Sequence, residues 1–405
     1  MKATLVSYGS MGDILPMVAL AVGLRAAGHQ VVTVGDEAGA ELAARYGLEF
    51  HTLAGRLQEL VEPGRPLALL IDAGHFTLKS LSYDAHDRDR LSLIQEVAQG
   101  SDVVLGMPVA HYHALAAARE VGARPVLGVL QPLAPTSAMT PAGAGMPSMP
   151  RVLRRPIGEI VQWGGWMNAR RSLNSARREL GQAPIADPTR DAFSLCAWSP
   201  TLVPQPDDWP THQFAVTGHW HLPAKTWVPD PDLAAFLAAG EPPVYVGFGT
   251  MQGFSAMPRL LDGILTGLAS RRVILAAGPN VLRDRQLSRN VHRMTGFVPH
   301  DWLFSRCSVI VHHCGAGTGH EAAAAGVPSV PVPISMDQPF WARRLHDLGI
   351  ASAPINPRRP SIEAIHQAIT KAESDPLRLR AVQVAQRIAQ ENGVSAAITR
   401  LEQLL

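Results

Sequence analysis

Short, nearly continuous apolar runs alternate with glycine-containing turns and helix-like segments along this chain. Near the amino terminus, Ala3–Ser7 has the pattern of a buried strand and Tyr8–Asp13 that of a turn. Pro16 then lies near the first turn of an expected helix that ends at Gly28, ahead of a second strand at Gln30–Val34. Proline near the start and glycine at the end favour a helix. The stretch predicts a β-α-β unit of a parallel sheet whose two faces are both covered.

The same pattern begins again in the second half of the chain. Val244–Phe248 reads as a strand, Gly249–Gly253 as a glycine-rich turn, and Pro258 lies early in the helix that follows. Val273–Ala277 is the next expected strand. Two such starts predict an α/β fold of two doubly wound, Rossmann-like domains that face each other across a cleft.

A proline-rich connector separates the two halves, because residues 200–231 contain seven prolines. We expect the boundary between residues 205 and 235, with a first domain over 1–215 and a second over 235–385.

The end of the chain has a helical pattern. Ser361–Leu405 fits two helices broken at Pro376, since proline cannot continue a helix. We expect residues 386–405 to form a helix that packs back on the first domain.

Composition describes a soluble globular protein with a large buried core. The 405 residues, 46% of them hydrophobic and 17% charged, are too many for one core and suit two domains. A formal net charge of +2 gives no general signature of nucleic-acid binding. Cys196, Cys307 and Cys314 form no C-x-x-C pair, so neither a disulfide framework nor a zinc ribbon is indicated. There is no signal-peptide pattern and no apolar run of about 18 residues, so we expect a cytoplasmic protein.

A glycine-rich turn, "HHCGAGTGHEAAAAGVP", occupies residues 312–328. Ser308–His312 is an expected strand and Thr318–Ala325 begins a helix, so the turn lies at the carboxyl end of a strand. Helix N-termini there hold anions, and glycines remove Cβ atoms that would keep a pyrophosphate from the backbone. The candidate contacts are Gly315, Gly317, Gly319, His313 and Thr318, with Glu321 one turn further on for a ribose hydroxyl. We interpret His312 as a packing residue, and the turn predicts a site for a nucleotide diphosphate.

The next strand ends beside this turn. Ser329–Pro333 is followed by Asp337 and Gln338, and a helix starts from Pro339. Neighbouring strands of a parallel sheet end at one edge, so this carboxylate and amide would lie where a sugar's hydroxyls could bind.

Four segments resemble one known enzyme family. The segment 312–350, "GSMGDILPMVALAVGLRAAGH", "GFGTM" and "TGFVPHDWLF" are similar to motifs of the family 1 nucleotide-sugar glycosyltransferases of the GT-B fold. The likeness is strongest to the bacterial branch with sterol and antibiotic-aglycone glycosyltransferases, and it covers essentially the whole chain. It implies a GT-B fold with an acceptor-binding first domain and a donor-binding second domain.

The resemblance also implies roles for individual residues. By that likeness the donor contacts are His313 at the diphosphate, Glu321 at the ribose, Asp337 and Gln338 at the sugar, Thr250 at the phosphates, and Val298 at the base through its backbone. Ser10 is a further candidate for a phosphate or acceptor contact. Met11 replaces a frequent arginine, and Cys314 and Gly319-His320 also depart from the usual pattern.

Asp13 is the candidate catalytic base, because the resemblance places a base in the turn after the first strand. An aspartate with an ordinary pKa of about 3.9 is a poor base for an alcohol unless proton transfer is concerted with attack. The alternative is a structural role, as an Asx-type turn or helix N-cap ahead of "ILPMVAL".

Two further segments of the first half bear on the acceptor. The proline-rich residues 131–156 are too long for an ordinary connection and predict a binding loop or a disordered lid. Arg151–Arg178 carries seven arginines and Glu159 as its one acid. It fits a solvated basic helix with Trp163 and Trp166 packed inward; an acceptor pocket lined by these tryptophans and a membrane-surface contact are the alternatives.

The family resemblance implies an inverting transfer of a hexose or deoxyhexose from a UDP- or TDP-sugar to a hydroxyl of a hydrophobic natural-product aglycone. The expected partners are thus a nucleotide sugar and a hydrophobic small molecule; we expect neither nucleic acid nor a membrane contact. The oligomeric state stays open. We also expect no cofactor and no metal, since neither His111/His113 nor His219/His221 has a carboxylate or cysteine beside it in sequence.

Three other functions are alternatives to this one. A nucleotide-sugar epimerase or hydrolase, and a non-catalytic helper of a transferase, would share the same fold. An NAD-dependent dehydrogenase would need G-x-G-x-x-G after the first strand, which "GSMGD" lacks.

Overall fold

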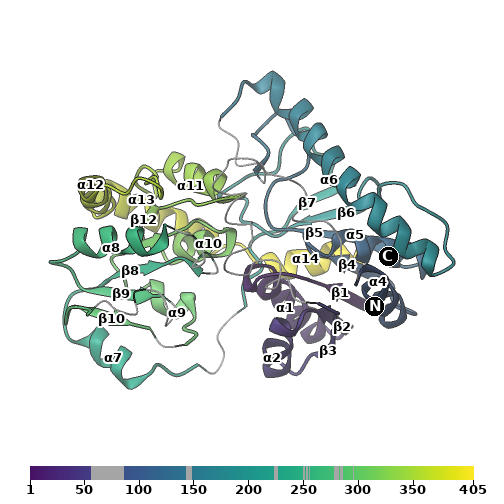
Figure 1. Cartoon of the computed structure of the whole chain (residues 1–405), viewed down its shortest axis with the longest axis horizontal. Coiled ribbons are helices and arrows are strands. Elements are labelled where there is room, and N and C mark those ends of the chain that lie inside the picture. Colours follow the sequence, from purple (N-terminus) through teal and green to yellow (C-terminus); the bar gives the residue numbers. More distant parts are fainter. Residues whose placement is uncertain are drawn as a thin grey trace. The chain divides into compact units, whose positions relative to one another are not determined.

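The computed structural model describes residues 1–405 apart from 56–85, 143–147, 223–226, 250, 252–253, 255, 278–281, 283–285 and 295. The chain forms two compact units, the first made of Met1–Leu222 and Asn392–Leu405 and the second of Pro223–Glu391. Each unit is a parallel sheet with helices on its faces (Figure 1). The prediction of two doubly wound, Rossmann-like α/β domains is confirmed.

The first unit is built on parallel strands in the order β3-β2-β1-β4-β5-β6-β7. Its strands are β1 (Lys2–Val6), β2 (Gln30–Gly35), β3 (Glu49–Thr52), β4 (Val103–Gly106), β5 (Arg124–Val129), β6 (Phe193–Cys196) and β7 (Phe214–Val216). Its helices are α1 (Met11–Ala26), α2 (Glu37–Arg45), α4 (Asp87–Val97), α5 (His111–Glu120), α6 (Arg151–Glu179) and α14 (Gly393–Glu402). The central strands β1 and β4 are buried along almost their whole length, as helices on both faces require.

The second unit has parallel strands in the order β10-β9-β8-β11-β12. Its strands are β8 (Val244–Gly247), β9 (Val273–Ala276), β10 (Val291–Arg293), β11 (Val309–His312) and β12 (Ser329–Pro331). Its helices are α7 (Pro231–Ala238), α8 (Met257–Gly267), α9 (His300–Phe304), α10 (Ala316–Ala324), α11 (Gln338–Asp347), α12 (Ile362–Ala372) and α13 (Asp375–Ile388).

The strand orders locate one special point in each sheet. From β1 the chain winds outward through β2 to β3 and then returns to place β4 on the other side of β1. The second unit repeats this with β8, β9 and β10 on one side and β11 next to β8 on the other. Ligands of open α/β sheets bind beyond the carboxyl ends of the two strands where the order reverses. Ligand-binding residues are therefore expected in the turns after β1 and β4 and in the turns after β8 and β11.

The carboxyl-terminal region contains three helices where the sequence predicts two. Pro376 stands at the start of α13, so the expected break between α12 and α13 is present. A second break occurs at Asn392, whose side chain accepts the Ser395 N–H at 3.1 Å and caps α14. At Gly393 a Cβ would lie 2.4 Å from the His219 carbonyl oxygen. The prediction of an unbroken second helix was wrong, because α13 ends at Ile388 and Asn392 starts a new helix as its N-cap.

The last helix belongs to the core of the first unit. Ala397, Ile398 and Leu401 of α14 lie in the same buried cluster as Leu20 and Leu24 of α1. The two helices also approach closely at Gly23, where a Cβ would lie 2.3 Å from a methyl carbon of Val394. The chain end therefore closes the hydrophobic core of a unit that begins about four hundred residues earlier.

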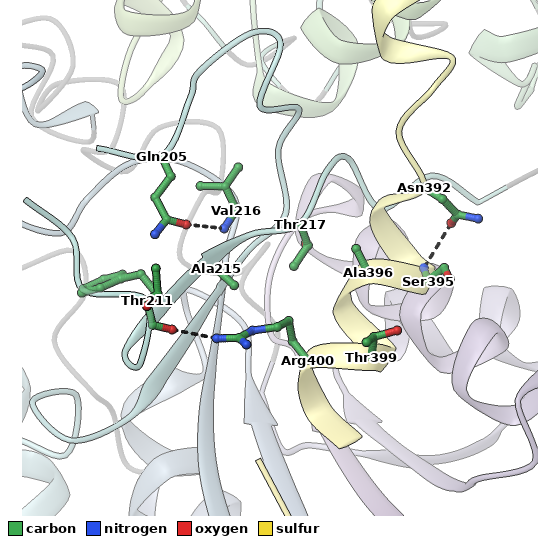
Figure 2. Close-up of a pocket in the computed structure, with 11 residues that line it drawn as sticks. Gln205, Thr211, Ala215, Val216, Thr217, Asn392, Ser395, Ala396, Thr399 and Arg400 are labelled. Atoms are coloured by element: carbon green, nitrogen blue, oxygen red, sulfur yellow. Dashed lines mark hydrogen bonds between the residues drawn. The ribbon is translucent and has the colours of Figure 1, made fainter. Parts of the chain in front are cut away.

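A groove of about 630 Å³ lies between β7 and α14 (Figure 2). On one side Arg400 donates to the Thr211 carbonyl oxygen at 2.7 Å. On the other, the Gln205 side-chain oxygen accepts the outward N–H of Val216 at 3.1 Å. These bonds tie α14 to the residues before β7 and satisfy an N–H at the edge of the sheet.

Replacing Leu401 by alanine tests the role of α14. Because Leu401 is fully buried, Leu401→Ala should lower the free energy of unfolding by about 2–5 kcal/mol through lost burial and a residual cavity. Calorimetry should show a lower melting temperature for the first unit. Leu405→Ala, at a side chain that is 62% exposed, is the matched control and should change little. An unchanged melting curve for Leu401→Ala would contradict the assignment of α14 to this core.

Candidate active site

The loops after β8 and β11 are shaped around the imidazole of His313. A Cβ on Gly315 would lie 2.7 Å from His313 Nε2, and one on Gly249 would lie 3.2 Å from His313 Cε1. Gly249 also has a φ of +50°, which glycine adopts without penalty. These glycines make room for the histidine, whereas Gly317 has no atom within 4 Å of where its Cβ would be. Of the glycines predicted to admit a pyrophosphate, Gly317 is the one that faces open space.

Cys314 holds the turn in a strained conformation. Its φ is +63°, which costs a non-glycine residue about 1–2 kcal/mol. The Cys314 N–H donates to His312 Nδ1 at 3.2 Å, and His312 Nε2 lies 3.0 Å from Ser329 Oγ. Because Nδ1 accepts, Nε2 carries the proton and donates to the hydroxyl. Burial lowers the pKa of His312 to about 3, so this buried histidine stays neutral and fixes the turn.

His313 is also neutral at physiological pH. Burial lowers its pKa to about 4, His300 nearby lowers it further, and the Gly247 backbone partly offsets both. Burial likewise lowers the pKa of His300, with Glu321 and Asp301 acting in the opposite direction. His300 stacks on Phe304 with ring centroids 4.3 Å apart. His300 was not singled out from the sequence, although it stands in the quoted motif "TGFVPHDWLF".

The start of α10 is arranged to receive an anion. Gly315 occupies the N-cap position, and no side chain caps the helix. At this end of the helix the Gly319 N–H donates to the Gly315 carbonyl at 2.9 Å. The N–H groups of the first turn, at Ala316, Gly317 and Thr318, therefore lack a partner within the helix, and the helix dipole favours negative charge there.

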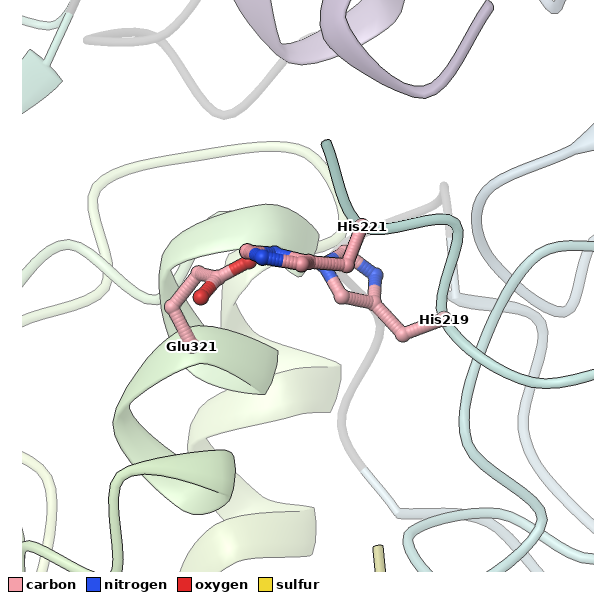
Figure 3. Close-up of side chains that lie close together, drawn as sticks. All are labelled: His219, His221 and Glu321. Carbon is pink, nitrogen blue, oxygen red and sulfur yellow. The ribbon is translucent and has the colours of Figure 1, made fainter. Parts of the chain in front are cut away.

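Glu321 projects from α10, one turn after these N–H groups (Figure 3). Val298 is buried in the core of the second unit, next to Leu303 and Phe304, so its side chain packs inward. That leaves its backbone as the part that could meet a base. Thr250 lies outside the residues that the structure describes.

Asp337 and Gln338 stand at the start of α11, after β12. The Gln338 side-chain oxygen accepts the N–H groups of Ile334 and Ser335 at 2.8 and 3.0 Å, and the residue is buried. An Asp337 oxygen accepts the indole N–H of Trp341 at 2.9 Å. Gln338 therefore shapes the loop with its oxygen, while the half-buried Asp337 carboxylate is held in position by Trp341.

In the first unit, Asp13 and Ser10 form a capping box at the start of α1. Ser10 is the N-cap and its hydroxyl oxygen accepts the Gly12 N–H at 3.2 Å. One Asp13 oxygen accepts the Ser10 N–H and hydroxyl, both at 3.0 Å. The sequence suggested that Asp13 could itself be the helix N-cap. In the structure Ser10 is the N-cap, and Asp13 lies in the first turn of α1. A Cβ on Gly9 would lie 2.7 Å from the same carboxylate.

The pKa of Asp13 is raised to about 6. Burial is the main cause, the two hydrogen bonds from Ser10 act against it, and the neighbouring charge of Asp36 raises it further. Asp36 follows β2, is buried, and has a raised pKa for the same reason of lost hydration. No sequence pattern distinguishes Asp36, because an acid after a strand is common. A carboxylate with a pKa near 6 is a far better base than a free aspartate.

His111 and His113 stand at the start of α5 and not on a strand. Residues two apart on a helix face different sides. His113 Nε2 lies 3.2 Å from the buried Asp87, which also pairs with Arg90 at 3.5 Å and accepts from Ser172 Oγ. His111 Nδ1 bonds to the Pro108 carbonyl, and burial lowers the pKa of His111 to about 4.

His219 and His221 lie on the irregular segment after β7, with ring centroids 6.4 Å apart (Figure 3). Trp220 between them is buried in the core of the first unit, and its indole N–H donates to Thr217 Oγ1 at 3.0 Å. The two histidines thus flank a tryptophan whose side chain is part of the core.

Part of the proline-rich segment 131–156, of which 143–147 lie outside the described residues, is anchored to Asp208 and Trp209. Asp208 accepts from Thr136 Oγ1 at 2.5 Å and from the Ser137 N–H at 2.8 Å. The indole N–H of Trp209 donates to the Pro135 carbonyl at 3.1 Å. These bonds show an ordered arrangement at residues 135–137; a binding role for the segment stays a prediction.

The two tryptophans of α6 have different surroundings. The Trp166 ring packs on Tyr112 with centroids 5.6 Å apart and is half-buried, as expected of an inward side chain. Trp163 is 58% exposed, so the expectation that both pack inward was wrong for this residue. The physical reason is the length of α6, whose first half extends beyond α4 and α5 (Figure 1).

In the described part of the chain, no helix combines the length and apolar character needed to cross a bilayer.

Two family models match the sequence. The glycosyltransferase family 28 N-terminal domain matches residues 3–81, and the C-terminal domain of erythromycin biosynthesis protein CIII-like proteins matches residues 271–404.

Whole-chain relatives agree with these matches. The chain is 32% identical to O-mycaminosyltylonolide 6-deoxyallosyltransferase of Streptomyces fradiae, over 100% of this chain and 97% of that enzyme. It is 29% identical to a sterol 3-beta-glucosyltransferase of Arabidopsis thaliana, over 98% of this chain and 64% of the plant protein. The crystal structure of glycosyltransferase VinC in complex with DTDP shares the fold, with a TM-score of 0.74 at 19% identity over 100% of this chain and 99% of VinC. The chain therefore belongs to the GT-B nucleotide-sugar glycosyltransferases, in the branch of the antibiotic and sterol glycosyltransferases.

Proposed function

We propose that this protein is an inverting glycosyltransferase that moves a hexose or deoxyhexose from a UDP- or TDP-sugar to a hydroxyl of a hydrophobic natural-product aglycone. The observation that carries the proposal is the position of Asp13 and His313. Each stands in a turn beside the point where the strand order of its sheet reverses, after β1 and after β11 respectively.

The second unit would bind the donor. The uncapped start of α10 and the neutral His313 can donate hydrogen bonds to a diphosphate, and Glu321 can accept from a ribose hydroxyl. Asp337 and the NH₂ of Gln338 would contact the sugar. VinC was crystallised with DTDP and the Streptomyces fradiae relative is named for a 6-deoxyallosyl transfer, which supports a thymidine nucleotide and a deoxysugar.

The chemistry would then be one displacement. As the acceptor hydroxyl oxygen bonds to the anomeric carbon, Asp13 takes its proton. The bond from that carbon to the diphosphate oxygen breaks, and the diphosphate leaves with the bonding electron pair. The N–H groups of α10 and His313 stabilise the charge that develops on it, a contribution of the oxyanion-hole type. A single displacement inverts the anomeric configuration.

The acceptor would lie against the first unit and be largely apolar. The acceptors in the names of two relatives, O-mycaminosyltylonolide and a sterol, support this. Trp166, half-buried beside Tyr112, fits the wall of a pocket. Trp163 could contact only an acceptor that reaches the exposed side of α6.

We further propose that the reaction needs no metal. The chain has Asp-x-Asp sequences, a pattern that could hold a divalent ion. Asp87 of the first, however, is buried in pairs with His113 and Arg90. Asp230 of the second accepts the Asp232 N–H at 2.9 Å and caps α7. Turnover should therefore persist in EDTA; its loss, restored by Mg²⁺ or Mn²⁺, would refute this part.

The donor site is tested at His313. His313→Ala should weaken binding of UDP or TDP by about 1.5–3 kcal/mol, roughly 10- to 150-fold, because a hydrogen bond to a charged phosphate is lost. Titration calorimetry with both nucleotides measures this and also separates uridine from thymidine. His346→Ala, an exposed histidine on α11, is the control and should bind normally. Equal affinities of wild type and a folded His313→Ala would remove His313 from the site.

The base is tested by Asp13→Asn. Asparagine keeps an oxygen for the Ser10 N–H, so the melting temperature should change little, but it cannot take a proton. Turnover should fall about 10²-fold or more with donor affinity unchanged. Mass spectrometry and NMR of the product give the rate and the anomeric configuration. A fully active asparagine variant, or a product that retains the configuration of the donor, would refute the proposal; donor hydrolysis without transfer would indicate a hydrolase.

The same residue predicts the pH dependence. The reactive form of Asp13 is the carboxylate, and its pKa is raised to about 6. kcat/KM should therefore fall about tenfold per pH unit as pH drops below that value and level off above it. In Asp13→Asn the residual activity should lose this acid limb. An acid limb near pH 4 in the wild type would show that another group limits the rate.

A further inference from the structure

Exposed apolar side chains gather on the first half of α6. Val152 is 78% exposed, Leu153 49%, Ile160 61% and Trp163 58%. Single exposed apolar residues are ordinary on protein surfaces, but a contiguous set on one element marks a surface that contacts something.

These side chains share one side of the helix. At about 100° per residue, positions 152, 153, 160 and 163 fall within roughly 100° of one another around the axis. We call them the outer face of α6.

Another side of α6 is already occupied by the rest of the first unit. A Cβ on Gly158 would lie 3.0 Å from the Cα of Pro135. Arg154 donates to the carbonyl oxygens of Ala138 at 2.7 Å and Met149 at 3.1 Å. The helix is thus held from one side by the residues around 131–142, while its outer face meets solvent.

Positive charge surrounds the outer face. Arg151 and Arg155 lie at its start and Arg170 and Arg171 beyond Trp163, and all four are exposed. Glu159 is the one acid between Arg151 and Arg178, and it pairs with Arg155 at 3.3 Å. Because the whole chain carries a net charge of only +2, this helix concentrates basic charge.

We infer that the outer face of α6 docks the protein on an anionic lipid surface. A helix with apolar and aromatic residues on one side and arginines around them lies in the plane of a membrane interface, with its apolar side among the acyl chains. Each arginine near an anionic leaflet strengthens the partition roughly fivefold. A second copy of the chain fits less well, because a symmetric contact would bring the same arginines together.

Vesicle co-sedimentation of the full chain tests the inference without any substrate. The protein should bind vesicles of equal parts phosphatidylcholine and phosphatidylglycerol at least tenfold more strongly than phosphatidylcholine alone, and high salt should weaken the binding. The double variant Val152→Ser with Ile160→Ser should bind the mixed vesicles at least tenfold more weakly. Arg170→Gln with Arg171→Gln should reduce the preference for anionic lipid.

The matched control is Leu379→Ser with Val382→Ser on α13, two side chains that are 65% and 48% exposed. It removes exposed apolar surface elsewhere and should bind like the wild type. Equal melting temperatures establish that the variants are folded. The inference is overturned if the wild type does not bind the mixed vesicles, or if the Val152/Ile160 variant binds as well as the control. It is also overturned if sedimentation velocity shows that this face instead joins two copies.

Discussion

All strands of both sheets are parallel, and this constraint decides where chemistry can take place. A connection between neighbouring parallel strands must cross over the sheet, in most cases here through a helix, so the strand-to-helix turns of a sheet lie at the same edge. Helix N-termini point to that edge with their unpaired N–H groups. Where the strand order reverses, the helices diverge to opposite faces and leave the turns after β1 and β4, and after β8 and β11, uncovered. The candidate residues Ser10 and Asp13 are found in the turn after β1, and His313 in the turn after β11, so two of these four turns carry them.

Burial gives these turns a common electrostatic character. Lost hydration lowers the pKa of His312 and His313 to about 3 and 4, and raises that of Asp13 to about 6. All three shifts favour the neutral form of the side chain. In the second unit the two histidines therefore carry no positive charge before a diphosphate binds. The proposed first contacts of the diphosphate are then the N–H groups of α10 and a neutral imidazole. In the first unit it brings a carboxyl group close to the working range of a general base.

The sequence was sufficient for those features that depend on local rules. Two doubly wound units could be predicted from the apolar runs, the glycine turns and the Gly315–Gly319 segment. Strand burial and helix starts depend on neighbouring residues, so these features are visible in the sequence. The positions that escaped prediction depend on contacts between distant segments. That Gly249 makes room for the ring of His313 follows from the approach of the loops after β8 and β11. His300 and Asp36 act through burial and charge, which no local pattern displays. The exposure of Trp163 depends on how far α6 extends past its neighbours.

At Asp13 the structural and the chemical roles are coupled, and the coupling explains why neither excludes the other. The same carboxylate oxygen that accepts two hydrogen bonds from Ser10 is the group that would take a proton. Those bonds stabilise the charged form and oppose the rise in pKa that burial and Asp36 produce. Removing them would make a stronger base but would also release the first turn of α1, and with it the position of the carboxylate. The second oxygen accepts no bond from Ser10 and can face a hydroxyl. A capping box therefore orients the proposed base through one oxygen, while burial raises its basicity.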